Sequence, residues 1–103
     1  MTTKELYNGL LSLGYPVAYS HFAEGSVPEA PFIVYSYQGS DNFAADGITY
    51  YEVEDIDIEL YSKIKDLEAE KKIADFLTEN GIFYQKQEYY IESEKMIQVI
   101  FEI

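Results

Sequence analysis

A serine next to the chain's one histidine is the first pair whose residue types could do chemistry. Ser20 and His21 are adjacent, and a serine nucleophile with a histidine base would indicate acyl transfer. That reaction also needs an oxyanion hole and a nucleophile on a sharp turn, and no G-x-S-x-G or comparable motif is present. One histidine and no cysteine also exclude imidazole or thiolate metal clusters within one chain. The sequence therefore predicts no catalysis and no cofactor.

Carboxylates are the second group that could do chemistry, since hard cations bind several oxygens at once. In a strand, however, alternate acids point the same way about 6.5–7 Å apart, which forms a row of charge rather than a closed cage. The 41–47 segment also misses the spacing of an EF-hand loop. We interpret the acids as a charged face, comprising Glu52, Glu54, Asp55, Asp57 and Glu59.

The overall charge argues against one class of function, direct binding to nucleic acid. The chain has 103 residues, with 19 acids against 7 lysines and no arginine, for a net charge of −12. Binding to nucleic acid phosphates is driven by cations, so a direct grip on DNA is not expected. Hydrophobic residues make up 48% and aromatic residues 17%, enough for one folded domain over 1–103. No signal peptide or membrane span is recognisable, which predicts a soluble, unexported protein.

Periodicity predicts one helix and three strands in the first part of the chain. A capping box at Thr2 and Glu5 begins a helix over about 3–13. A short or edge strand is expected over 17–22, after Pro16. Strands over 32–37 and 48–62 then form a long hairpin, and a reversal of parity predicts a bulge or change of face near 53–55.

The remainder adds a helix and two strands. Asp66 can cap a helix that ends at Asn80 and Gly81, with an apolar stripe formed by Leu67, Ile73, Ala74, Phe76 and Leu77. Strand-like runs follow over 82–91 and 96–103, joined by a polar turn. The expected fold is α+β, in the order α-β-β-β-α-β-β. It has a four- to five-stranded antiparallel or mixed sheet with two helices mainly on one face.

Tyrosines and the 39–47 connector suggest contacts with other proteins. Most of the eleven tyrosines fall in predicted strands, where aromatic residues are ordinary, but tyrosine is also enriched at protein interfaces. Phe43 stands in a small, polar connector, which either folds back onto the core or reaches a partner. The interface residues we predict are Ser40, Asp41, Asn42, Phe43, Asp46, Tyr50 and Tyr51.

The order of several segments resembles the tail completion or head-to-tail joining proteins of long-tailed bacteriophages and of prophages in Gram-positive bacteria. The segments are PVAYSHFAEG at 16–25, APFIVY at 30–35, SDNFAADG at 40–47, IELYS at 58–62, GIFY at 81–84 and IESEKM at 91–96. Many members have a tryptophan where this chain has Tyr84. No single segment is diagnostic, and the resemblance rests on their order and spacing.

The resemblance implies a structural protein that acts by assembly. It implies a ring homo-oligomer, often a hexamer, between the portal connector and the tail-tube protein, formed in the host cytoplasm and kept in the virion. An acidic lumen would let DNA slide without sticking. The alternative is a small acidic DNA mimic or regulatory protein that binds a nucleic-acid-binding partner, and a small enzyme is a third possibility without a supporting motif.

Overall fold

The computed structural model describes residues 1–38 and 55–103. Helix α1 spans Thr3–Leu11 and begins with the predicted capping box, because Thr2 and Glu5 each accept the other's backbone N–H through the side chain. The helix ends two residues before the predicted limit. Leu13 and Gly14 donate to carbonyls only three residues back, which tightens the last turn into a non-α conformation.

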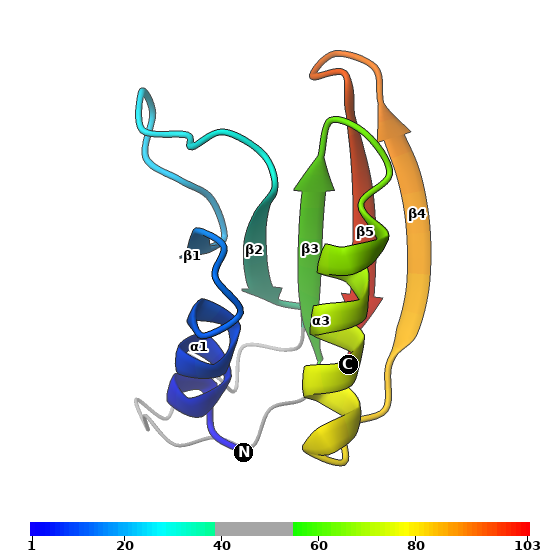
Figure 1. Ribbon diagram of the computed structural model, residues 1–103. Coiled ribbons are helices and arrows are strands. Elements are labelled where there is room, and N and C mark those ends of the chain that lie inside the picture. Colours follow the sequence, from blue (N-terminus) through cyan, green and yellow to red (C-terminus); the bar gives the residue numbers. More distant parts are fainter. Residues whose placement is uncertain (39–54) are drawn as a thin grey trace.

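The sheet has five strands in the order β1-β2-β3-β5-β4 (Figure 1). Among these described strands β1 and β2 run parallel and the other neighbours run antiparallel, so the sheet is mixed. The element order α-β-β-β-α-β-β confirms the predicted α+β fold. The strands are β1 (Val17–Tyr19), β2 (Phe32–Tyr37), β3 (Ile56–Ser62), β4 (Gln85–Ile91) and β5 (Met96–Glu102).

Strands β1 and β4 are shorter than predicted, and β5 ends one residue early, at Glu102. Strand β1 ends at Tyr19 because Ser20 has a φ of 68°, outside the extended region. Strand β4 begins at Gln85, so Ile82 and Tyr84 lie in the connection before it.

Strand β3 begins at a β-bulge. The N–H of Asp55 donates to the Ile103 carbonyl at 3.2 Å, while the Ile103 N–H donates to the Ile56 carbonyl at 2.9 Å. Asp55 and Ile56 therefore both oppose Ile103, and Asp55 has a left-handed φ of 57°. This confirms the predicted bulge near 53–55, whereas the 48–54 part of the predicted strand lies outside the described residues.

Helix α3 spans Leu67–Glu79 and has the predicted ends. Asp66 accepts the Ala69 N–H at 3.0 Å, and beyond the helix the Ile82 N–H returns to the Leu77 carbonyl at 2.9 Å. The predicted apolar stripe was wrong at Leu67, which is exposed. Leu67 is six residues from Ile73, which places the two about 120° apart around the helix.

Both helices pack on the same face of the sheet. The core joins Leu6 and Leu10 of α1 and Ile73 and Leu77 of α3 to buried strand residues. In Figure 1, α3 crosses in front of β3 and β5. Those buried strand residues are Val17, Ile33, Tyr35, Ile56, Ile58, Leu60, Val99 and Phe101.

Candidate functional site

The face of the sheet opposite the helices, here called the outer face, gathers acidic side chains from two strands. Strand pairing places three carboxylates on it, from Asp57 and Glu59 of β3 and Glu102 of β5. No lysine lies at the positions of β2 to β5 on this face. Those positions are Phe32, Val34, Ser36, Asp57, Glu59, Tyr61, Gln85, Gln87, Tyr89, Ile91, Met96, Gln98, Ile100 and Glu102.

Two of these carboxylates face each other across the β3–β5 pair. Asp57 is directly opposite Glu102. Burial, and then the negative charges of Glu102 and Glu59, raise the pKa of the Asp57 carboxyl. In the described part of the chain no group of three metal-binding side chains is placed to hold an ion. The three carboxylates therefore form a strip of like charge rather than a chelating site.

Glu59 is held in place by two donors from the same face. The Tyr61 hydroxyl donates to Glu59 Oε1 at 2.6 Å, and Gln98 Nε2 donates to the same oxygen at 3.1 Å. Gln98 Nε2 also donates to the Tyr61 oxygen at 2.9 Å. Burial, followed by the bond to Glu59, raises the pKa of the Tyr61 hydroxyl. The network fixes the orientation of the Glu59 carboxylate on the outer face.

A second network positions Glu102. Gln87 Nε2 donates to Glu102 Oε1, and the Tyr89 hydroxyl donates to Gln87 Oε1. The donors come from the edge strand β4 and the acceptor from its neighbour β5. Two of the three acids of the outer face, Glu59 and Glu102, are therefore held by uncharged partners, which do not cancel their negative charge.

The structure brings together only part of the predicted acidic face. Asp57 and Glu59 lie on one face as expected, but the placement of Asp55 in the same row was wrong, because the bulge removes it from the strand's alternation. Glu52 and Glu54 lie outside the described residues. The same holds for every predicted interface residue, namely Ser40, Asp41, Asn42, Phe43, Asp46, Tyr50 and Tyr51.

Ser20 and His21 form a local contact at the end of β1. His21 Nδ1 lies 3.2 Å from Ser20 Oγ, and both residues are exposed. Within residues 1–38 and 55–103 no carboxylate bonds the His21 ring.

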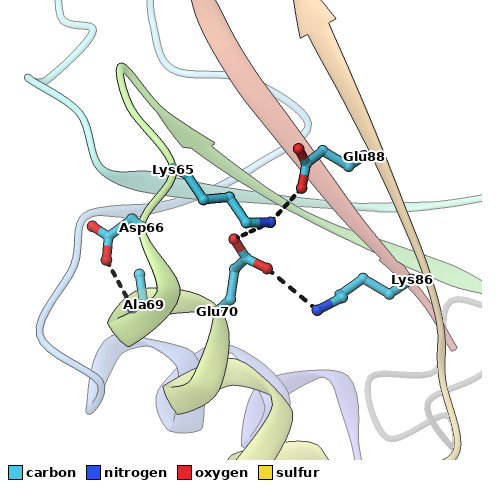
Figure 2. Close-up of polar contacts among 6 residues, drawn as sticks. All are labelled: Lys65, Asp66, Ala69, Glu70, Lys86 and Glu88. Carbon is cyan, nitrogen blue, oxygen red and sulfur yellow. Dashed lines mark hydrogen bonds and ion pairs between the residues drawn. The ribbon is translucent and has the colours of Figure 1, made fainter.

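A buried carboxylate between α3 and β4 was missed in the sequence (Figure 2). The Glu70 side chain is 4% exposed and lies between two lysines. Lys65 Nζ is 2.7 Å from Oε2, and Lys86 Nζ is 3.3 Å from Oε1. Lys65 also pairs with Glu88 of β4. Contacts with Glu70, and then with Glu88, raise the pKa of the Lys65 ammonium.

This cluster joins the helix to the edge strand. Lys65 and Lys86 keep 40% and 47% of their side-chain surface exposed, so both remain hydrated. The two lysines balance the charges of Glu70 and Glu88, so the cluster has no excess charge. This favours a structural role over a reactive one. Helical spacing places Glu70 on the apolar side of α3, and this signal could have revealed it.

Among the described residues, the most exposed aromatic side chain lies in the connection between α3 and β4. Phe83 is 96% exposed. It borders a hollow of about 240 Å³ lined by Thr78, Gly81, Ile82, Phe83 and Tyr84. An aromatic ring left almost wholly in water is costly unless a partner covers it. Its signal in the sequence was the apolar run next to the predicted helix stop.

No family model, no curated protein and no solved structure matches this chain. None of the helices in the described part of the chain is both long enough and apolar enough to cross a membrane.

Proposed function

We propose that this chain is a structural subunit of the head-to-tail junction of a long-tailed bacteriophage or prophage. It acts by assembly into a ring between the portal connector and the tail tube, without catalysis. The sequence resemblance suggests this role, and the observation that carries it is the outer face, with three carboxylates and no lysine at its strand positions.

The charge distribution fits a DNA passage. Lys65 and Lys86 form ion pairs with Glu70 and Glu88 on the helix side of the sheet. The outer face therefore keeps its negative charge. If it lines the lumen, it repels phosphate and lets DNA slide, whereas a basic wall would bind it.

Assembly itself is the first test. The chain is mixed at high concentration with the tail-tube protein of the same phage or prophage, and the products are measured by light scattering and electron microscopy. Rings seated on tube ends support the proposal. A monomer that binds neither the tube protein nor the portal connector overturns it, whereas a monomer in the absence of partners does not.

A charge reversal tests the lumen. In a phage that carries both Asp57→Lys and Glu59→Lys, tails should still join heads, but DNA ejection should be slowed. The control is the double variant Glu68→Lys and Glu79→Lys, which makes the same change of net charge on helix α3. Equal ejection in the two variants would contradict an acidic lumen.

The same acidic strip favours one competing function, a DNA mimic that blocks a nucleic-acid-binding protein. The lysines of helix α3 would disturb a surface that mimics DNA, but they lie away from the outer face. Capture of a purified basic DNA-binding protein that is lost in moderate salt, together with no binding to tail tubes, would select this alternative.

A further inference from the structure

In the part of the chain that the structure describes, strand β4 is a long edge of the sheet with a neighbouring strand on one side. It spans Gln85–Ile91 and pairs on one side with β5, and it is last in the sheet order. The opposite edge, β1, has only three residues. All residues of β4 except Ile91 are exposed. An exposed edge of seven residues is a template for another strand.

The pairing of β5 decides which β4 groups face outward. Ile103 bonds to Ile56, on the β3 side of the sheet. Bonding alternates along an antiparallel strand, so the even-numbered residues of β5 bond to β4. Their partners in β4 are the odd-numbered residues, from Gln85 to Ile91. The backbone groups that point away from β5 therefore belong to Lys86, Glu88 and Tyr90.

Few registers allow this edge to pair with itself. Residues whose backbone groups point away from β5 must lie opposite each other, because they exchange the hydrogen bonds between the two copies. The possible pairings are Lys86 opposite Lys86, Lys86 opposite Glu88, Glu88 opposite Glu88, and registers that are shifted further. The first and third place like charges together. The second makes two Lys86–Glu88 pairs around Gln87, and it puts Tyr84 opposite Tyr90. Lys86 and Glu88 are 47% and 46% exposed, so both can accept a further partner.

We propose that two copies of this chain pair through β4, antiparallel about a two-fold axis at Gln87. The product is one continuous sheet of ten strands, twice the five of each copy. Lys86 of each copy then lies opposite Glu88 of the other, which extends the Glu70 cluster across the junction. This two-fold contact goes beyond the proposed ring, whose contacts are head-to-tail, so either can fail without the other.

A single-thiol variant tests the register, since the chain has no cysteine. Gln87→Cys places two thiols opposite each other at a non-hydrogen-bonded pair, about 4.5 Å apart between Cα atoms. Mild oxidation should then give a disulfide-linked dimer. Gln85→Cys and Tyr89→Cys are matched controls on the same strand and face. In the proposed register their thiols are separated by about 13 Å along the strand, too far for a bridge.

The outcome is read on a non-reducing gel over a range of protein concentrations. Dimer from Gln87→Cys alone supports the proposal. No dimer from Gln87→Cys, or equal dimer from all three variants, overturns it. Circular dichroism of each variant checks that the fold is retained.

Sedimentation equilibrium gives a second, independent readout. Glu88→Gln removes two symmetric charge pairs. The dissociation constant of the dimer should therefore rise by about twofold to thirtyfold. Glu92→Gln, in the turn beyond β4, should leave the dimer unchanged. A wild-type chain that stays monomeric at all concentrations, or an equal effect of the two variants, contradicts the pairing. Assembly on tail tubes should survive Glu88→Gln, which separates this result from the proposed function.

Discussion

Lys65 Nζ lies 2.7 Å from Oε2 of Glu70, a carboxylate with only 4% of its side chain exposed. The contact ties the loop before α3 to the helix, and Lys86 ties the same carboxylate to β4. One buried acid thus holds three segments together at the edge of the sheet.

Glu70→Ala should lower the free energy of unfolding by about 1–3 kcal/mol, because both ion pairs and the packing of the side chain are lost. The loss should be moderate, since the two freed lysines already reach water. Urea denaturation at neutral pH measures it.

The control is Glu68→Ala on the same helix. Glu68 pairs with Lys72 at 3.6 Å but is 79% exposed, so its removal should cost at most about 0.5 kcal/mol. Equal losses in the two variants would show that burial of Glu70 has no energetic consequence.

Asp57→Asn should stabilise the protein at neutral pH, by roughly 0.2–1 kcal/mol, because it removes one of two like charges that face each other. The sign follows from the raised pKa of Asp57. The folded state holds this proton more tightly than the unfolded state, so its stabilising contribution is full below the unfolded pKa and is lost as pH rises through the folded pKa.

The gain from Asp57→Asn should therefore shrink as pH falls below about 4, where the aspartate is protonated in both states. Glu59→Gln on the same strand and face should instead be destabilising, since Glu59 accepts hydrogen bonds from Tyr61 and Gln98. Stability curves against pH for the three proteins check this. A gain that does not change with pH would mean that charge repulsion is not its cause.

Asp55→Gly should raise the free energy of unfolding by about 1 kcal/mol. Asp55 has a φ of 57°, and a left-handed backbone costs a residue with Cβ about 1–2 kcal/mol, which glycine avoids. Asp55→Val should be destabilising, because β-branched residues adopt this conformation least readily. Thermal unfolding of both variants measures the difference. If glycine proved the less stable of the two, the bulge geometry would be wrong.

Local signals in the sequence were enough for the element types, their order and both helix starts. Alternation of Ile56, Ile58 and Leu60 identified the buried side of β3, and a break in that alternation located the bulge. The β2–β3 and β4–β5 hairpins were predicted correctly. The β3–β5 pairing was not readable, because α3 and β4 separate the two strands in the sequence. For that reason Glu102 was not recognised as a member of the acidic face.

Charged and aromatic residues outside regular patterns were harder to place. Glu70 looked like an ordinary helix acid, since its lysine partners come from a loop and from a strand 16 residues away. Phe83 was assigned to a strand, where an aromatic residue is common. The late start of β4 leaves it in the connection after α3, exposed to water.

Phe83→Ala should leave stability within about 0.5 kcal/mol of the wild type, because a side chain that is 96% exposed contributes little to the fold. If the Phe83 side chain contacts a partner in the head-to-tail junction, the same change should weaken assembly on tail tubes. Aromatic anchors often contribute much of the binding energy of an interface. Phe101→Ala is the opposite case: the side chain is fully buried, and its loss should cost about 3–5 kcal/mol. Unfolding curves and a tube-binding assay on both variants separate the two roles. Normal assembly by a stable Phe83→Ala protein would mean that this ring is not a contact.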